Sequence, residues 1–364
     1  MIATEELLHA ANEAAAAESL HKARCTDGLP IIVPTPERVE RMLLHSAGVP
    51  REASLGQLLP MGGDLTVEKA AINAVMAGCA PEVFPIVIAA CEAVADPDFD
   101  AGPMQNTTHA VTPLIVVNGP ARDLFGVSYG IGAMGPGWAA NLTIGRAIRL
   151  VMINVGGGVP GIGDMATLGS PAKIALCLAE AEEASPFEPL HVSLGYAAGD
   201  STVTLLQVEG PHSMMFSLTD VGDQAELFCR TLAAGFANPA SNNIYTGVGA
   251  VAAALNPIHA RLLHKHGWTR ARVQQRLFEL AQAPRTTLRA ISGSNTDTIP
   301  HDREIARVVE RPEDFLLFVA GEDGGAYSAY FPTWGGGKRG SVPVTKKIRI
   351  DEGCEIPASR RSLT

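Results

Sequence analysis

Five consecutive hydrogen-bonding residues, Gln105 to His109, stand directly before an apolar run at residues 114–118. Histidine is the side chain whose ordinary pKa lies nearest neutral pH, so His109 is a candidate general acid or base. Thr108 beside it is a candidate substrate ligand. In the alternative, His109 is an ordinary loop histidine that is hydrogen-bonded to backbone. Because polar loops beside core strands often carry function, we keep His109 as a catalytic candidate.

Carboxylates and histidines recur after two later apolar segments. Glu182, Glu188 and His191 follow an expected strand at residues 173–179, and His212 follows the next apolar run. Carboxylates and imidazoles can transfer protons or bind a metal. Glu182, Glu188 and His212 are therefore catalytic candidates and His191 a candidate substrate ligand, while the alternative for the acidic run is a solvated turn. The spacing matches no known metal-ligand pattern, so the sequence defines neither a metal nor a cofactor.

A group of amide and guanidinium side chains suggests binding of an anion. Asn118 ends the expected strand, and Asn141 and Arg146 lie near the start of an expected helix at residues 140–150. Helix N-termini and guanidinium groups both attract anions. All three residues are therefore candidate ligands for a small anionic substrate. In the alternative, Asn141 only caps the helix and Arg146 pairs with an acid such as Asp164 or Glu180.

These candidates lie at the ends of apolar elements, where α/β proteins place their clefts. We therefore expect the side chains of His109, Asn118, Asn141 and Arg146 to converge in one pocket.

A thiol is a further candidate. Cys79 precedes Pro81, where a helix is expected to start, and a helix N-terminus lowers the pKa of a thiol. The alternative is a small buried residue that packs as a hydrophobe. None of the six cysteines forms a Cys-x-x-Cys pair, which argues against a dithiol or thiolate zinc site. The Gly-x-Gly-x-x-Gly matches at residues 130–135 and 156–161 are expected to be turns, because neither has the context of a dinucleotide site.

Composition limits the partners. The formal net charge of −10 argues against nucleic acid and against an anionic membrane surface, since both require clustered Lys and Arg. The longest apolar stretch, residues 83–95, is too short to span a bilayer. With an acidic start and dispersed cysteines, the sequence predicts a cytoplasmic protein with reduced thiols.

The elements that must position these residues alternate between strands and helices, which predicts an α/β fold with a mixed sheet and flanking helices. Three strands that each end near a glycine suggest related strand-turn-helix units. Strands are expected at 114–118, 202–209 and 315–320, and helices at 4–24, 66–76, 81–95, 140–150, 223–234, 257–266 and 269–282.

The sequence also predicts the domain boundaries and the assembly. Residues 1–240 are expected to form the main α/β domain, with 241–364 completing it or forming a second domain. The polar tail after Arg339 is expected on the surface. The helices at 66–76 and 81–95 are apolar nearly all round, so we expect at least one of them at a subunit contact in a homo-oligomer.

Several segments together resemble a bacterial family of largely uncharacterised proteins that occur fused to, or beside, a small domain with a U-G-S-C (selenocysteine or cysteine) motif. The resemblance extends over most of residues 26–330 and is carried by residues 27–30, 66–79, 107–109, 117–120, 141–146 and 188–191. It implies a soluble enzyme subunit, in thiol or selenol chemistry. No Cys-Gly-Ser-Cys occurs in this chain, so a redox centre would have to come from a partner protein.

The sequence thus favours a cytoplasmic enzyme that acts on a small anionic molecule by acid–base bond cleavage or addition, as a lyase or hydrolase does. A thiol- or selenol-dependent redox subunit that uses Cys79 and a partner protein is the second hypothesis. A non-catalytic assembly protein is the third.

Overall fold

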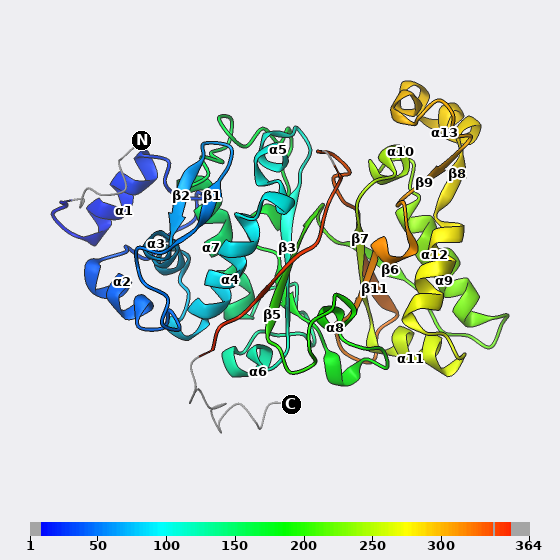
Figure 1. Ribbon diagram of the computed structural model, residues 1–364, viewed down its shortest axis with the longest axis horizontal. Coiled ribbons are helices and arrows are strands. Elements are labelled where there is room, and N and C mark those ends of the chain that lie inside the picture. The colour runs from blue at the N-terminus through cyan, green and yellow to red at the C-terminus, as the bar shows by residue number, and fades with distance from the viewer. Residues whose placement is uncertain (1–8, 338, 351–364) are drawn as a thin grey trace.

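Two four-stranded sheets stack face to face in the computed structural model, and helices cover the outer face of each (Figure 1). The structure describes residues 9–337 and 339–350. The first sheet has the order β12 (Val344–Lys347), β5 (Thr202–Val208), β3 (Thr112–Asn118) and β4 (Cys177–Ala179). The second has the order β10 (Phe315–Val319), β7 (Val251–Leu255), β11 (Tyr327–Phe331) and β6 (His212–Met215). The α/β fold with mixed sheets and flanking helices is as the sequence predicts.

Alternation along the strands builds the core on both sides of each sheet. In β3, Leu114 and Val116 face the other sheet, whereas Ile115 and Val117 face the helices of the first layer. Residues of β7 and β10 alternate in the same way between the inter-sheet core and the second helical layer. A strand that is buried on both faces is mostly apolar, and this explains why β3, β5 and β10 are evident in the sequence.

The helices that contact the first sheet are α4 (Phe84–Val94) and α7 (Ala139–Asn154), and α3 (Val67–Ala77) packs on both of them. Those of the second layer are α9 (Gln224–Phe236), α11 (Pro257–Lys265) and α12 (Arg270–Leu280). Shorter helices are α1 (Glu13–Lys22), α2 (Pro36–Leu43), α5 (Ala101–Asn106), α6 (Ala121–Phe125), α8 (Leu190–Ser193), α10 (Asn243–Thr246) and α13 (Arg285–Ser292). Two small sheets pair β1 (Ser54–Leu58) with β2 (Gly63–Thr66) and β8 (Gln282–Pro284) with β9 (Ile305–Arg307).

The two sheets follow one pattern. In each, a central strand has a parallel neighbour (β4 beside β3, β10 beside β7) and an antiparallel one (β5 or β11). The fourth strands are exchanged, because β6 follows β5 in the chain but pairs with β11, whereas β12 follows β11 but pairs with β5. Helix α4 lies on β5 and β12 as α9 lies on β11 and β6. The chain is therefore built from two related units that swap their last strands.

Several expectations need correction. The three strands that suggested related units, β3, β5 and β10, occupy three different positions in that pattern. The tail after Arg339 was expected on the surface, but it contributes β12 to the first sheet. The strand expected at 173–179 is reduced to β4, because residues Pro171–Lys173 form a 3-10 turn. Each sheet contains strands from both sides of residue 240, since β6 joins the second sheet and β12 joins the first.

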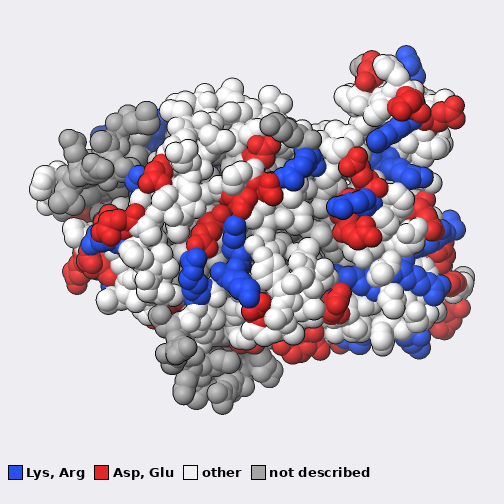
Figure 2. Space-filling model, viewed as in Figure 1, with Lys and Arg blue, Asp and Glu red and all other residues white. Residues whose placement is uncertain are grey.

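Ion pairs flank the returning strand β12 on the face shown in Figure 2, where basic and acidic side chains alternate. Lys346 pairs with Asp96 at 2.6 Å, and Lys347 pairs with Asp200 at 2.8 Å. Each of these two surface lysines is therefore paired with one acidic side chain.

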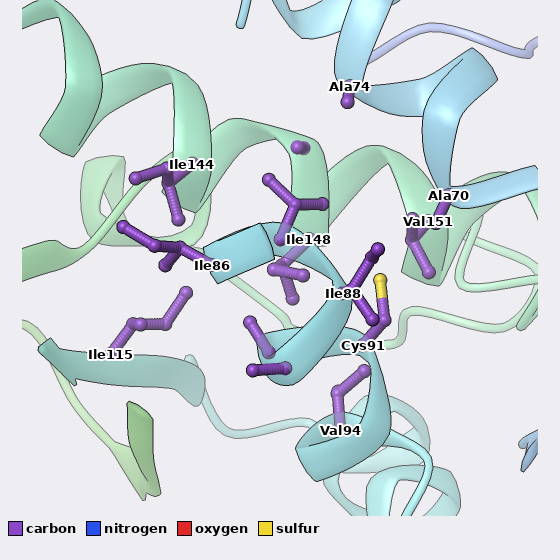
Figure 3. Close-up of a cluster of buried hydrophobic side chains, with 14 of the residues drawn as sticks. Ala70, Ala74, Ile86, Ile88, Cys91, Val94, Ile115, Ile144, Ile148 and Val151 are labelled. Atoms are coloured by element: carbon purple, nitrogen blue, oxygen red, sulfur yellow. The ribbon is translucent and has the colours of Figure 1, made fainter. Parts of the chain in front are cut away.

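The two apolar helices are buried within one chain (Figure 3). Ile86 of α4 lies beside Ile144 of α7 and Ile115 of β3, and Ile88 and Cys91 lie further along α4, near Val151 of α7. The other side of α4 packs against β5 and β12. Because packing within one chain accounts for both helices, their apolar character does not require the subunit contact that the sequence suggested.

None of the helices in the described part of the chain is both long and apolar enough to cross a lipid bilayer.

Candidate active site

A histidine–glutamate pair lies where β3 begins and β5 ends. These strands are antiparallel, and Thr112 stands opposite Val208, so the segment before β3 meets the segment after β5. Nε2 of His109 is 3.1 Å from Oε1 of Glu209. The two side chains are 24% and 23% exposed, so solvent reaches both while the surrounding loops hold them. A positioned, solvent-accessible histidine of this kind can serve as a general acid or base.

The second ring nitrogen of His109 is held less firmly. With the Nε2–H donated to Glu209, Nδ1 carries a lone pair, and Nδ2 of Asn242 lies 3.3 Å from it. The same amide nitrogen donates to the carbonyl of Trp334 at 3.4 Å. Thr107 anchors the loop, since its Oγ1 accepts from the His109 backbone N–H and the Trp334 indole. A substrate that donates a proton to Nδ1 can therefore displace the long contact with Asn242.

Two proton-bearing side chains adjoin the pair. His212 on β6 has its Nε2 3.9 Å from Oε2 of Glu209, and its ring stacks on Tyr330 at 5.2 Å between centroids. Burial, and then the negative charge of Glu209, raise the pKa of the Tyr330 phenol. Tyr330 therefore stays protonated at neutral pH, and its phenol is a weaker acid than that of a free tyrosine. The structure thus links His109 and His212 through Glu209.

The pair lies where the two related units meet. Val208 at the end of β5 bridges to Thr333, just past β11, and the Glu209 backbone N–H donates to the Pro332 carbonyl at 2.8 Å. Such junctions are preferred locations for ligand sites. Among the described residues, no group of three or more His, Cys, Asp and Glu side chains is arranged to hold a metal ion.

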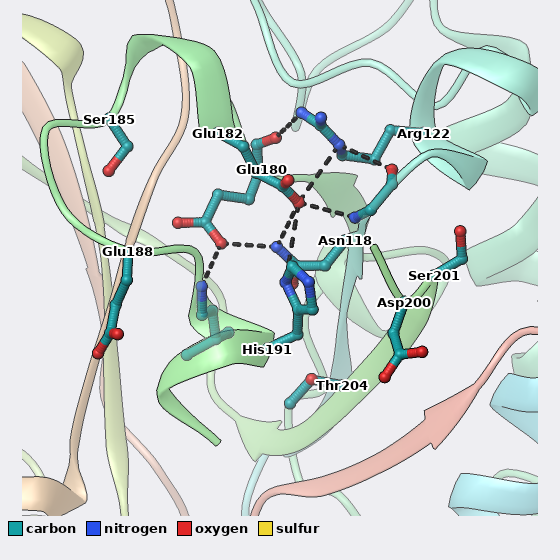
Figure 4. A network of polar contacts seen from close by, with 12 residues as sticks. Asn118, Arg122, Glu180, Glu182, Ser185, Glu188, His191, Asp200, Ser201 and Thr204 are labelled. Atoms are coloured by element: carbon teal, nitrogen blue, oxygen red, sulfur yellow. Dashed lines mark hydrogen bonds and ion pairs between the residues drawn. The ribbon is translucent and has the colours of Figure 1, made fainter. Parts of the chain in front are cut away.

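A second polar network lies at the opposite end of β3 (Figure 4). β3 and β4 are parallel, so Asn118 at the end of β3 meets Glu180 just after β4. Nδ2 of Asn118 donates to Glu180 at 2.7 Å and to Glu182 at 2.9 Å. Glu182 also accepts from the Gly119 N–H at 2.7 Å and lies 3.4 Å from Nε of Arg122.

This network belongs to the interior. Asn118, Glu180 and His191 are fully buried. Burial raises the pKa of the Glu180 carboxyl, although the charge of Arg270 and the hydrogen bonds that Glu180 accepts oppose this shift. Among the residues that the structure describes, neither ring nitrogen of His191 has a hydrogen-bond partner, and Nδ1 is 3.9 Å from Glu182. A site closed to solvent cannot receive a substrate without rearrangement. The network therefore fixes the loops that follow β3 and β4.

The expected convergence of four candidates is wrong. His109 and Asn118 lie at opposite ends of β3, because the whole strand separates them. Asn141 does not cap its helix, since Trp138 is the N-cap and Asn141 is buried in the first turn. Its amide bonds the backbone N–H and carbonyl of Ser128 at 2.8 and 2.9 Å.

Arg146 is engaged by an acid that the sequence analysis did not consider. Its Nε and Nη2 donate to the two carboxylate oxygens of Asp27 at 2.7 and 2.9 Å, and Nη2 donates to the Pro30 carbonyl at 2.8 Å. The structure therefore supports the structural alternative for Arg146, with Asp27 in place of Asp164 or Glu180.

Arg146→Lys is consequently expected to lower the free energy of unfolding by about 1–3 kcal/mol, because a lysine cannot make both bonds to Asp27. Burial raises the pKa of Asp27, but the hydrogen bond and charge of Arg146 outweigh it and the net shift is downward. This stability is present above the unfolded pKa of Asp27 and is lost as the pH falls through its folded pKa. Urea unfolding at pH 7 and pH 3 measures both effects.

Arg38→Lys is the matched control, since Arg38 pairs with Glu13 at 3.1 Å on the surface, where such pairs contribute about 0–1 kcal/mol. Equal losses in the two variants would show that the Asp27 pair is an ordinary surface pair.

The remaining candidates are dispersed. Cys79 is buried and follows the C-cap of α3, and burial raises the pKa of its thiol to about 12, opposite to the expected direction. Glu188 is exposed and points away from the buried network (Figure 4). Thr108 is exposed, and its carbonyl accepts from the Thr167 N–H at 2.9 Å. The glycines at 156–161 follow helix α7 instead of a strand, as expected for a turn.

Two residues of the site were not among the candidates from the sequence. Glu209 was visible beside His212, but nothing joined it to His109, which lies 100 positions earlier. Asn242 is 133 positions from His109 and lies in a turn-rich segment. Only the pairing of β3 with β5, and the junction between the units, bring these residues together.

Comparison of the chain with protein-family models, with curated proteins and with solved structures found no match.

Proposed function

We propose that this chain is an enzyme that transforms a small molecule by acid–base bond cleavage or addition, as a lyase or hydrolase does. That the molecule is anionic stays an expectation from the sequence, because Asn118, Asn141 and Arg146 are engaged within the fold. The observation that carries the proposal is the half-buried His109–Glu209 pair, which has a weakly engaged Nδ1 facing neighbouring polar groups. General acid–base catalysis by a positioned histidine contributes about 10²–10⁴-fold to a rate.

Each group has a distinct role in this proposal. Nδ1 of His109 takes a proton from the substrate or from an attacking water. Glu209 orients the ring and stabilises the imidazolium that forms, 3.1 Å from Nε2. The leaving group then takes a proton from His212 or Tyr330, whose rings stack on one another beside Glu209. The proton gained by His109 then passes through solvent to the group that lost one, which regenerates the resting state.

The thiol-dependent alternative has less support. Of the described cysteines, Cys79, Cys91, Cys177 and Cys229 are buried, and burial raises the thiol pKa of each. Protonated, enclosed thiols are poor nucleophiles. The described cysteines are all free thiols, which favours a reducing compartment, and we include the cytoplasm in the proposal.

A substrate panel tests the proposal. Small carboxylates and phosphorylated acids, each with a leaving group or double bond next to the acidic carbon, are incubated with the full chain, and products are detected by mass spectrometry. The same panel is repeated after alkylation with iodoacetamide. The proposal expects turnover that survives alkylation and is lost in His109→Gln. Turnover abolished by alkylation would favour the thiol hypothesis, and no turnover in any arm would favour the assembly protein.

A further inference from the structure

Strand β6 has an open edge. It is the last strand of the second sheet and pairs with β11 on one side only. The Phe216 backbone N–H donates to the Ala326 carbonyl, and backbone groups alternate in direction along an antiparallel strand. Ser213 and Met215 therefore point their N–H and C=O groups away from β11. Within the described part of the chain, no group forms a hydrogen bond with these outward N–H and C=O groups.

The equivalent strand of the other unit has its edge closed. β12 is the last strand of the first sheet, and the Ile348 N–H donates to the Ser201 carbonyl at the end of its pairing with β5. By the same alternation, Thr345 points its C=O away from β5, and the Tyr196 hydroxyl donates to that carbonyl at 2.8 Å. Lys347 adds a charge to the strand. Charges and covering groups are the usual protection of an edge strand, and β6 has neither.

The surroundings of β6 are uncharged and apolar. Between Glu209 and Asp220, the chain has no Lys, Arg, Asp or Glu. A chain with a net charge of −10 repels its own copies, so an uncharged edge is where two copies approach at least cost. Exposed apolar side chains border this edge on β6, on β11, in the loop after β6 and on α9, and such patches mark interaction sites. They are Met215, Tyr327, Leu218, Val221 and Leu227.

We propose that β6 pairs antiparallel with β6 of a second copy of this chain, so that the second sheet continues across a two-fold axis. With the axis at Met214, Ser213 of each copy lies opposite Met215 of the other, and all their outward N–H and C=O groups find partners. The contact is isologous, because the same surface is used by both copies. The apolar side chains that border β6 would be covered in the dimer and would add to its buried area.

The proposed contact begins beside the candidate active site. His212 is the first residue of β6, and its Nε2 lies 3.9 Å from Oε2 of Glu209. The oligomeric state is measured without a substrate, so the inference does not depend on the proposed function.

Sedimentation velocity of the full chain over a series of micromolar concentrations, with hydrogen exchange on the same samples, tests the pairing. We expect a monomer–dimer equilibrium. The amides of Ser213 and Met215 should be protected in the dimer and exchange on dilution, whereas the amide of Met214, which points to β11, should stay protected throughout. Ser213→Pro removes one outward N–H and leaves the bonds to β11, since edge strands tolerate proline there. It should weaken dimerisation at least tenfold, and Ser213→Ala should stay within twofold of the wild type.

If the proline variant does not fold, Met215→Lys places a charge on the edge and should weaken dimerisation at least tenfold. Ile291→Lys is its matched control, because Ile291 on α13 is 61% exposed and Met215 is 64% exposed. This control should stay within twofold of the wild type. A monomer at every concentration, a dimer whose Ser213 and Met215 amides exchange as they do in the monomer, or equal weakening in the two lysine variants would each overturn the proposal.

Discussion

Replacing His109 with glutamine is expected to lower kcat/KM about 10²–10⁴-fold on the substrate that the panel identifies. Glutamine can keep a hydrogen bond to Glu209, whose Oε1 lies 3.1 Å from the histidine Nε2, but it cannot accept a proton in the reaction. The side chain is 24% exposed, so the free energy of unfolding should change by no more than about 0.5 kcal/mol. Steady-state kinetics and urea unfolding of the same sample separate the two effects.

His264→Gln is the control, because His264 is an exposed histidine on α11 far from β3 in the sequence. It should retain wild-type kinetics. If His109→Gln kept wild-type activity, or lost activity only in proportion to lost folded protein, His109 would have no role in the chemistry.

Replacing Gly119 with alanine is expected to destabilise the chain by about 3 kcal/mol or more. Gly119 has a φ of +78°, which disfavours any side chain, and a Cβ there would overlap the Asp200 carbonyl oxygen and lie 2.8 Å from the Ser201 Cα. The left-handed backbone costs about 1–2 kcal/mol and the overpacking a further 1–3 kcal/mol. The substitution would also displace the Gly119 backbone N–H, which donates a hydrogen bond to Glu182. Urea unfolding measures the loss.

Gly48→Ala shares the backbone strain without the collision, since Gly48 has a φ of +74° and no atom lies within 4 Å of the place that a Cβ would take. It should cost about 1–2 kcal/mol. If the two alanines cost the same, the close approach of residues 119 and 200 would contribute nothing to stability.

The layers of the fold could be predicted because local pattern determines them. β3, β5 and β10 are buried on both faces and are mostly apolar, and α9, α11 and α12 begin at the side-chain caps Asp223, Asn256 and Thr269. The strands that were missed carry weaker signals. β7 is mostly alanine, and β6 and β12 are short polar edge strands whose pairing depends on the exchange between the two units.

The site was predictable only in part, because its residues come together through long-range pairing. His109 and His212 were identified by type and by position beside apolar segments. Glu209 and Asn242 are brought to His109 by the β3–β5 register and by the junction of the units. Neither of these can be read from the pattern of a single sequence. Arg146 was misassigned because its partner, Asp27, lies 119 positions away.

The most direct measurement of the central claim is a double-mutant cycle on His109 and Glu209, with kcat/KM determined for the wild type, His109→Gln, Glu209→Gln and the double variant. Glu209 acts mainly through the His109 imidazole at 3.1 Å, since its contact with His212 is longer at 3.9 Å, so its removal should cost activity in the wild type and little further once the imidazole is gone. We therefore expect the double variant to be little slower than His109→Gln alone. Losses that multiply would contradict the claim that the two residues work as one acid–base unit.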